Sequence, residues 1–389
     1  MMNSVANNYN RKKIVFSHGK GIYLFTNEGE KYIDLAAGIA VNLLGHSNKD
    51  LINALNAQSR KLWHVSNLYE IEEQVTLANN LTSCSFAHKV FFCNSGAEAV
   101  ECTIKAARRY HFSKGKPEKT EIITFKGSFH GRTLGTIAAA SNSSHLEGFG
   151  EPLKGFVSIE RNDINQLKKA CNEKTAAILI EPVQGEGGIN VFDRDFINSL
   201  KVIAKEMDLL ILFDEVQCGV GRTGKIFAYQ WFDIKPDVMA LAKGLGGGFP
   251  IGACLMRDDI AEALIPGTHG STFGGNPLAM AVGNCVMDIV NKVDFLSNVE
   301  KNGLFFKNEL NKLCDKYPNV IAEIRGLGLM IGIKCSVANN LLANKLYENG
   351  ILTVNAADNV IRILPPLNIT MSEIKKVMSL FEKSIKEIL

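Results

Sequence analysis

"VMALAKGLGGG", residues 238–248, joins an apolar run to a glycine-rich turn and has Lys243 where the two meet. An ammonium group loses hydration free energy where water is scarce, so burial lowers its pKa and favours the neutral amine. A neutral amine can attack a carbonyl group and hold it as a Schiff base. The stretch therefore indicates an aldehyde cofactor, although a single lysine after a strand is more commonly just exposed.

Two more apolar runs end on acidic residues. Residues 176–180 (AAILI) lead to Glu181, and residues 209–213 (LLILF) lead to Asp214. Short, uninterrupted apolar runs of this kind are typical of buried parallel strands. Because ligands bind at the carboxyl edge of such sheets, we expect Glu181, Asp214 and Lys243 to gather there. The alternative is that each carboxylate only caps the helix that follows it.

An anion site is indicated by residues 89–109. The apolar run KVFFC (89–93) is followed by Asn-Ser-Gly at 94–96 and then by helix-forming sequence. Free backbone N–H groups and the helix dipole favour a dianion at the start of such a helix. The spacing matches neither the dinucleotide-binding nor the P-loop pattern, and Asn-Ser-Gly is also an ordinary helix start.

Two further loops carry residues suited to a binding site. The turn KGSFHGRT (126–133) contains Phe129, which could stack on a cofactor ring, and Arg132, which could hold a carboxylate through two hydrogen bonds. Taken alone, these residues would be a core aromatic and a surface ion pair. The segment HGSTFGGNP (269–277) is rich in hydroxyl and turn residues and could equally be a plain loop.

Together these segments resemble the class III pyridoxal-phosphate-dependent aminotransferases. The resemblance extends from about Phe16 to the C-terminus, with six blocks in the family's order and spacing. It implies an α/β protein of fold-type I, in which helices flank a mostly parallel central sheet beside a smaller α+β domain. It also implies pyridoxal 5'-phosphate as cofactor. The blocks are NSGAE (94–98), FHGR (129–132), EPVQGEGG (181–188), FDEVQ (213–217) with GRTG (221–224), AKGLGGGFP (242–250) and GSTFGGNP (270–277).

The resemblance implies roles for individual residues of the cofactor site. Lys243 is expected to bind the cofactor aldehyde covalently and to move protons between substrate and cofactor, and Asp214 to pair with the pyridine nitrogen. The family usually has threonine where this chain has Ala97, so one phosphate hydrogen bond, about 1 kcal/mol, is expected to be missing. The other expected cofactor-binding residues are Ser95 and Gly96 at the phosphate, Phe129 against the ring, Glu215 and Val216 beside Asp214, Gln217 at the ring hydroxyl, and Thr272 at the phosphate of a neighbouring subunit.

The resemblance also implies a pocket that accepts two substrates in turn. The expected reaction transfers an amino group from N2-acetyl-L-ornithine to 2-oxoglutarate, giving N-acetyl-L-glutamate 5-semialdehyde and L-glutamate in arginine biosynthesis. Arg132, with Ser271 alongside, would hold the substrate carboxylate. Glu186 would mask Arg362 for the first substrate and swing away for glutamate. The alternative for this last pair is a static surface ion pair worth at most about 1 kcal/mol.

The identity of the amine stays open. Ornithine-specific relatives tend to have a tyrosine within the segment that matches residues 37–42 (AGIAVN), whereas an acetyl group suits small apolar walls. This segment and residues 62–67 (LWHVSN) therefore favour an N-acylated substrate without separating acetyl from succinyl. Ornithine, succinylornithine and 4-aminobutyrate remain alternatives. So do a different reaction with the same cofactor and a non-catalytic regulator that only binds it.

Composition narrows the class of protein. The 389 residues carry a formal net charge of +3 without a long basic run, so neither nucleic acid nor a membrane is an expected partner. The nine cysteines include no Cys-x-x-Cys pair and suit reduced thiols, and no metal site is expected. Because residues 1–9 lack an apolar signal core, we expect a cytoplasmic protein. The expected assembly is a homodimer with shared active sites.

The order of apolar runs and helix-like stretches predicts two domains. Residues 51–275 are expected to form the large cofactor-binding α/β domain. Residues 276–389 are expected to form a small α+β domain, which residues 1–50 complete. Within the small domain, the pattern predicts a helix over residues 298–317 and one glycine-spaced strand over residues 324–333.

Overall fold

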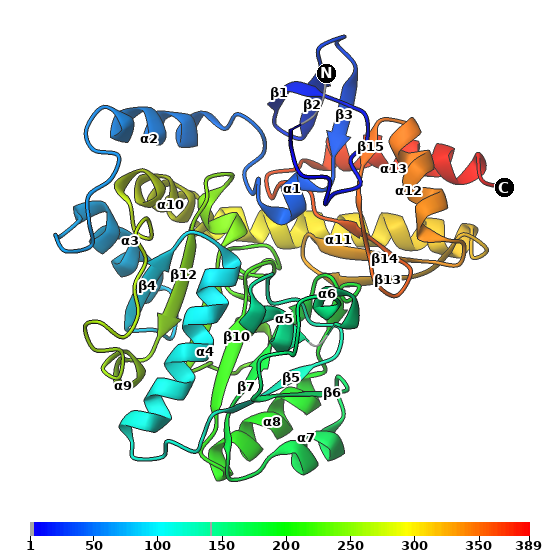
Figure 1. Cartoon of the computed structure of the whole chain (residues 1–389). Helices are drawn as coiled ribbons and strands as arrows, with labels where there is room; N and C mark the ends of the chain where they lie inside the picture. The colour runs from blue at the N-terminus through cyan, green and yellow to red at the C-terminus, as the bar shows by residue number, and fades with distance from the viewer. Residues whose placement is uncertain (1–3, 141) are drawn as a thin grey trace.

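The computed structural model describes residues 4–140 and 142–389 and has a seven-stranded sheet at its centre (Figure 1). The strand order is β4-β12-β11-β10-β7-β5-β6. All these strands run parallel except β12, which is antiparallel to both of its neighbours. The expected α/β fold with a mostly parallel sheet is therefore confirmed. The strands are β4 (Lys89–Cys93), β5 (Glu121–Phe125), β6 (Phe156–Ile159), β7 (Thr175–Ile180), β10 (Leu210–Asp214), β11 (Val238–Leu241) and β12 (Gly252–Met256).

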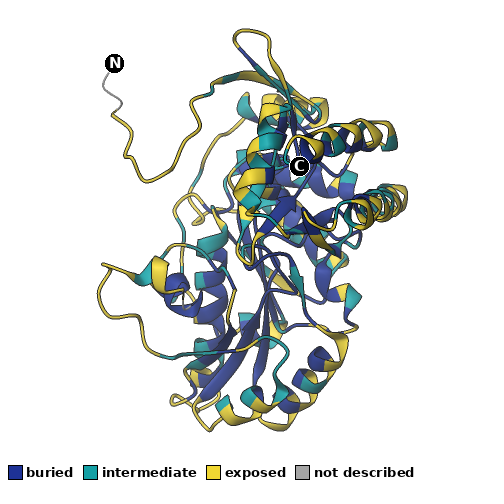
Figure 2. Ribbon diagram, turned by 90° about the vertical axis from the view of Figure 1, so that its right-hand side faces the viewer, coloured by how far each residue is buried: buried dark blue, intermediate teal, exposed yellow. Residues whose placement is uncertain are grey.

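Three neighbouring strands of this sheet, β7, β10 and β11, are buried along their whole length. Helices cover both faces of the sheet, which is why these strands are continuous apolar runs rather than alternating ones. Figure 2 shows the buried sheet as a dark blue centre beneath largely exposed helix surfaces. The three strands end beside Glu181, Asp214 and Ala242, so the sequence correctly predicts which residues share this edge.

Amphipathic helices form the layers around the sheet. In α8, the buried residues Phe196, Ile197, Leu200 and Ile203 recur at the spacing of one helix face, and Lys205 lies exposed on the opposite face. The helices of this part are α2 (Lys49–Ser59), α3 (Glu72–Ser83), α4 (Gly96–Ser113), α5 (Leu134–Ala140), α6 (Ser143–Leu146), α7 (Ile164–Ala170), α8 (Arg194–Glu206), α9 (Asp258–Ala261) and α10 (Pro277–Val290), with the short 3-10 helices η1 (Ala228–Trp231) and η2 (Lys243–Gly246).

Two four-stranded sheets form a smaller unit from both ends of the chain. In one sheet, N-terminal strand β3 pairs in parallel with β15 near the C-terminus. In Figure 1 these strands lie beside the C-terminal helices α12 and α13. A two-stranded ribbon, β8–β9, follows the large sheet's strand β7. The elements are β1 (Phe16–Lys20), β2 (Tyr23–Thr26), β3 (Lys31–Asp34), α1 (Ala37–Ala40), β8 (Val183–Gln184), β9 (Asn190–Val191), α11 (Val293–Lys316), β13 (Ile321–Leu327), β14 (Met330–Cys335), α12 (Asn339–Glu348), β15 (Ile351–Leu352), β16 (Val354–Ala356), β17 (Val360–Ile363) and α13 (Met371–Lys386).

The prediction of one strand over residues 324–333 is wrong. The segment is an antiparallel hairpin of β13 and β14, which turns at Gly328. Gly328 has a φ of +54°, and a Cβ there would lie 2.4 Å from the carbonyl carbon of Thr223, so only glycine fits. The helix predicted over residues 298–317 also begins earlier, at Val293.

The division into domains stays a proposal. Helix α10 packs on α2 and α3, which belong with the large sheet, whereas α11 packs on β13. These contacts favour a boundary after Val290, later than the predicted start at residue 276. Residues 1–3, the beginning of the predicted segment 1–50, lie outside the described residues.

The described ranges contain all nine cysteines, and each is a free thiol. Within the same ranges, no helix is both long and apolar enough to cross a membrane. Nor does the described part of the chain contain three or more His, Cys, Asp or Glu side chains grouped so that they could hold a metal ion.

Candidate active site

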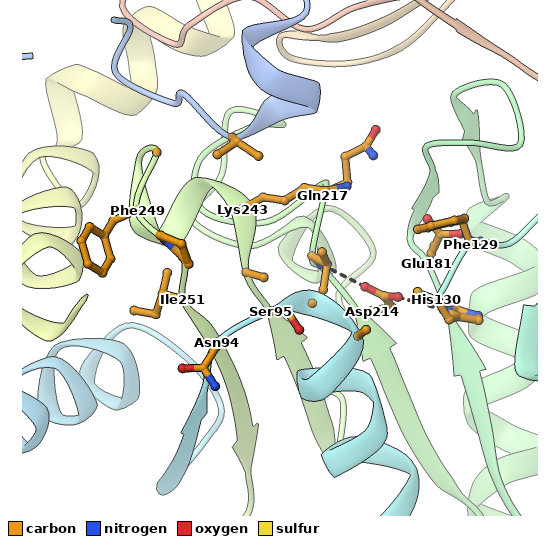
Figure 3. A pocket seen from close by; sticks show the side chains of 18 residues that line it. Asn94, Ser95, Phe129, His130, Glu181, Asp214, Gln217, Lys243, Phe249 and Ile251 are labelled. Carbon is orange, nitrogen blue, oxygen red and sulfur yellow. Dashed lines mark hydrogen bonds and ion pairs between the residues drawn. The ribbon is translucent and has the colours of Figure 1, made fainter. Parts of the chain in front are cut away.

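A cavity of about 310 Å³ lies at the carboxyl edge of the central sheet, a size typical of small-molecule sites. It is built from the ends of β10 and β11, the turn between β4 and α4, and the loop after β5. Figure 3 shows side chains from these elements converging on it. The predicted site residues that line it are Ser95, Gly96, Ala97, Phe129, Asp214, Val216, Gln217 and Lys243.

Lys243 lies two residues after the end of β11 and has a left-handed backbone with φ of +42°. A residue with a Cβ adopts this conformation at a cost, and such strained positions cluster at functional sites. Burial lowers the pKa of Lys243, and this effect outweighs the charges of Glu186 and Asp214, which act to raise it. The lysine in the cavity therefore has the electrostatics of a reactive amine.

Asp214 is the last residue of β10, and its side chain is 4% exposed. One oxygen accepts from the backbone N–H of Val216 at 3.0 Å, and the other lies 2.8 Å from Nδ1 of His130. Dashed lines in Figure 3 mark these contacts. Burial alone would lower the pKa of His130, but the hydrogen bond to Asp214 and the charges of Asp214 and Glu181 raise it.

His130 received no role from the sequence, although it lies in the quoted FHGR block. Its ring is fully buried, and Nε2 has no hydrogen-bond partner among the described residues. The strand before it, β5, is separated from Asp214 on β10 by β7. No spacing pattern in the sequence could have indicated that the two side chains meet.

The start of α4 has the geometry of a phosphate cradle. Ser95 caps the helix by accepting from the N–H of Glu98 at 3.3 Å. A Cβ on Gly96 would lie 2.6 Å from Cγ1 of Val216, so glycine allows this close packing. The free N–H groups and the helix dipole suit a dianion. The N–H groups at the start of α4 suit a phosphate, the amine of Lys243 suits an aldehyde, and the buried carboxylate of Asp214 suits a protonated ring nitrogen. Together these groups fit one molecule that carries all three.

Glu181 joins two loops of the site. Its carboxylate accepts from the N–H of Phe129 at 2.8 Å and from the N–H of Gly185 at 3.3 Å. Burial, followed by the charge of Asp214, raises the pKa of Glu181 to about 8. The side chain therefore fixes the turn that carries Phe129 against the loop that leads to Glu186.

Glu186 and Arg362 form a two-point ion pair, with Nη1–Oε1 at 2.7 Å and Nη2–Oε2 at 3.1 Å. Arg362 lies on β17, and its side chain is 1% exposed, whereas Glu186 is 35% exposed. Arg362 also donates to Gln217 Oε1 at 3.3 Å and to the Asn355 carbonyl at 3.2 Å. The buried guanidinium makes this more than the surface ion pair considered as the alternative.

Glu215 faces away from the cavity. Its carboxylate accepts from the N–H groups of Ala228 at 2.6 Å and Tyr229 at 2.7 Å, which open η1. Burial raises the pKa of Glu215 to about 8. Glu215 does not line the cavity, and its predicted cofactor contact stays a prediction.

Ser271, Thr272 and Arg132 lie outside the cavity lining. Ser271 Oγ accepts from the Asn94 side chain at 3.2 Å and from the N–H of Gly274 at 2.9 Å. Ser271 and Thr272 line a separate surface hollow with His64. Arg132 is exposed on the loop after β5. Contacts of Thr272 with a second subunit therefore stay a prediction.

The two segments expected near the amine substrate differ in position. In α1 the backbone is left-handed from Ala37 to Ala40, and Val41 immediately after it lines the cavity with an apolar side chain. Trp63 and His64, from the second segment, line a neighbouring surface hollow instead. Val41 thus gives the cavity a small apolar wall, and residues 37–42 contain no tyrosine.

Comparisons with known proteins identify the family of this chain. A family model described as aminotransferase class-III matches residues 4–385. The acetylornithine aminotransferase of Mesorhizobium japonicum is 53% identical over 369 residues, which cover 95% of this chain and 92% of that protein.

Solved structures are similar over nearly the whole chain. The N-acetylornithine aminotransferase of Stenotrophomonas maltophilia gives a TM-score of 0.85 at 36% identity, covering 98% of this chain and 97% of that one. An ornithine aminotransferase of Toxoplasma gondii gives 0.94 at 31% identity, covering 98% of this chain and 92% of that one. In that crystal structure, pyridoxal phosphate partly occupies the active site.

Proposed function

The chain belongs to the class-III aminotransferases, and on this premise we propose that it transfers the terminal amino group of N2-acetyl-L-ornithine to 2-oxoglutarate. The products are N-acetyl-L-glutamate 5-semialdehyde and L-glutamate, a step of arginine biosynthesis. The observation that carries the proposal is the meeting of Lys243, Asp214 and the start of α4 around one cavity. The 53% identity to an acetylornithine aminotransferase supports the choice of substrate.

Pyridoxal 5'-phosphate is the cofactor that this donor set suits. When bound, it supplies an aldehyde that holds the amine and a pyridine ring that withdraws electrons from the reacting carbon. The start of α4, with Ser95, Gly96 and Ala97, would hold the phosphate. Phe129 would lie against the ring. Asp214, held by His130, would pair with the ring nitrogen, and Gln217 would donate to the ring hydroxyl.

Lys243 is the residue proposed to move the proton. Its Nζ is a base when neutral and an acid when protonated, so one atom can take the proton from one carbon and return it to another. Burial lowers the pKa of Lys243 and so favours the neutral, basic form of its amine. Lys243 is half-buried and lines the cavity, so its amine can meet a substrate bound there.

The two carboxylate-bearing substrates need different charge patterns. Arg132 is proposed to bind the carboxylate that lies far from the reacting amine. Glu186 neutralises Arg362 while the acylated diamine acid is bound, because its amine-bearing end carries no carboxylate. When glutamate binds, its α-carboxylate replaces Glu186 on Arg362. The partial exposure of Glu186 beside a buried Arg362 supports Glu186 as the moving partner.

A homodimer is proposed as the working form. Large apolar side chains are exposed next to Thr272, with Trp63 at 65%, Leu68 at 86% and Phe273 at 58%. Exposed apolar groups in such number favour a protein interface. A second copy seated here would bring its Thr272 toward the phosphate end of the cavity. Thr272→Ala should then weaken cofactor binding without changing the mass of the dimer in solution.

The test of the proposed function is a single addition of L-glutamate to the cofactor-loaded protein. An aminotransferase converts the absorbance of the aldehyde form of the cofactor to that of its amine form, and later addition of 2-oxoglutarate reverses the change. A regulator that merely binds the cofactor keeps the first spectrum. An unchanged spectrum would overturn the proposal.

A further inference from the structure

Arg132 is held by one side chain from a different element. Within the described ranges, no carboxylate lies at ion-pair distance from its guanidinium. Its Nη2 lies 3.0 Å from Nε2 of His145, which belongs to the short helix α6. Its Cζ is 5.7 Å from the centroid of the Phe129 ring. An exposed arginine would otherwise be free to move, and a ligand that fixes it would have to overcome the loss of side-chain entropy.

The hydrogen bond from Arg132 determines which nitrogen of the His145 imidazole carries the proton. Guanidinium nitrogens only donate, so Nε2 must accept and the ring proton must lie on Nδ1. Nδ1 is buried and has no partner among the described residues. Burial and the charge of Arg132 lower the pKa of His145, while Glu186 acts to raise it. The ring that faces Arg132 at neutral pH is therefore uncharged.

His145 also contacts the residue proposed to lie against the cofactor ring. Its imidazole meets the Phe129 ring edge-to-face, with centroids 5.9 Å apart and an interplanar angle of 90°. One half-buried side chain thus touches both Phe129 and Arg132. This arrangement is suited to fixing the distance between the reacting end of the substrate and its remote carboxylate.

We propose that His145 is a positioning residue that sets the affinity for the carboxylate of the amine substrate by holding Arg132 in its binding orientation. The inference rests on the proposed function, because it assumes that Arg132 receives that carboxylate. Pre-ordering the guanidinium strengthens binding without touching the reacting atoms. Loss of this ordering should therefore raise KM for carboxylate-bearing amines and leave kcat nearly unchanged.

Two substitutions separate the hydrogen bond from the packing. His145→Phe keeps an aromatic edge against Phe129 but removes the acceptor for Arg132. His145→Gln keeps an acceptor near the position of Nε2 but removes the ring. Glu147→Gln, at the exposed end of the same helix, is the matched control. Two amines are compared: N2-acetylornithine and N-acetyl-1,4-diaminobutane, which has the same reacting amine and acetyl group but no carboxylate.

The expected result is specific to the carboxylate. For N2-acetylornithine, His145→Phe raises KM about tenfold, the loss of one charge-assisted hydrogen bond, and changes kcat less than about twofold. For N-acetyl-1,4-diaminobutane, KM stays at the wild-type value. His145→Gln restores most of the lost affinity for N2-acetylornithine. Glu147→Gln changes KM for neither amine. An equal rise in KM for both amines, or no rise for either, would overturn the proposal.

A binding measurement separates this inference from the proposed function. Calorimetric titration with glutarate, a five-carbon dicarboxylate that cannot react, reports carboxylate affinity whether or not any amine turns over. The dissociation constant for glutarate is expected to rise by a similar factor in His145→Phe and to recover in His145→Gln. Equal dissociation constants in wild type and His145→Phe would contradict the role of His145. Failure of every amine to react would instead contradict the proposed function.

Discussion

Lys243 combines a lowered pKa with a left-handed backbone, and both features follow from its place in the turn between β11 and the glycine-rich segment. The run of β11 ends at Leu241, and the glycine-rich turn that follows lets η2 fold back beneath the cavity. The lysine is thereby kept at the buried edge of the sheet instead of extending into water. Its reactivity is a property of this position and not of the residue type alone.

Replacing Lys243 by alanine tests this position directly. Lys243→Ala should retain the cofactor without a covalent bond and lose about a hundredfold to ten-thousandfold in single-turnover rate with N2-acetylornithine. The rate is followed by cofactor absorbance, and retention by dialysis. Lys225→Ala, which removes an exposed lysine paired with Glu300, is the control and should be unaffected. A near-normal rate in Lys243→Ala would refute the assignment.

Removing the carboxylate of Glu186 should change the balance between the two substrates. Glu186→Ala leaves Arg362 unmasked, so KM for glutamate should fall while KM for N2-acetylornithine rises, since a free cation then faces an incoming amine. Glu186→Gln, which keeps the size of the side chain but not its charge, should shift both constants in the same directions. If both variants keep the wild-type constants for both substrates, the ion pair is static.

Residue types and their order along the chain were enough to predict the cavity. Asp214 ends one strand of the sheet, while Lys243 and the turn at 94–97 come after the ends of two others, and strand order brings such ends together. His130 and His145 were missed because their partners, Asp214 and Arg132, come from other elements. Hydrogen bonds across the fold leave no local pattern. The Glu215 carboxylate bonds to the N–H groups that open η1, a direction that adjacency to Asp214 in the sequence does not reveal.

At the scale of elements, the junction of α4 with the loop after β10 decides whether the phosphate cradle can form. The two elements approach so closely that Gly96 has no room for a side chain against Val216. The same loop carries Asp214 at its start and Gln217 just beyond. Packing of α4 on this loop therefore sets the distance between the phosphate end and the ring end of the cavity.

A methyl group on Gly96 should push α4 away from the cavity. Overpacking of this kind costs about 1–3 kcal/mol, so Gly96→Ala should weaken binding of pyridoxal phosphate about tenfold or more in fluorescence titration. Val216→Ala removes the clashing methyl groups, and the double variant should recover much of the affinity. Equal affinities in wild type and Gly96→Ala would show that the helix does not depend on this contact.

Glycine positions also explain where element prediction failed. Residues 324–333 read as one strand because their apolar residues continue through Gly326 and Gly328 without a polar turn signal. The hairpin turns there because Gly328 takes a positive φ against the backbone of Thr223. That close approach involves Thr223, which lies in the loop after β10. The sequence of the hairpin alone therefore does not reveal it.

At the scale of the whole molecule, Arg222 ties the loop after β10 to the small unit. Its Nη1 donates to the carbonyls of Leu329 at 3.2 Å and Pro365 at 2.6 Å, while Nε and Nη2 have no partner in the described ranges. Pro365 follows the strand that carries Arg362. The side chain is fully buried and connects the two units beside the proposed switch.

Replacing Arg222 by lysine should weaken the contact between the two units. In Arg222→Lys one ammonium cannot keep both carbonyl contacts, and loss of one hydrogen bond from a charged donor costs about 1.5–3 kcal/mol. We expect a lower Tm and a higher KM for glutamate, since Arg362 moves with the small unit. Arg257→Lys, at an exposed ion pair, should change KM for neither substrate. An unchanged Tm and an unchanged KM in Arg222→Lys would show that Arg222 does not hold the two units together.

The substrate of this aminotransferase is identified by the single-turnover rate of amino transfer from four amines to the cofactor-loaded protein. The amines are N2-acetylornithine, N2-succinylornithine, ornithine and 4-aminobutyrate, and the signal is the loss of the cofactor's aldehyde absorbance. We expect a large preference for N2-acetylornithine, because Val41 offers an apolar wall to the acetyl group and Arg132 can bind the carboxylate. A preference for N2-succinylornithine, ornithine or 4-aminobutyrate would contradict this assignment.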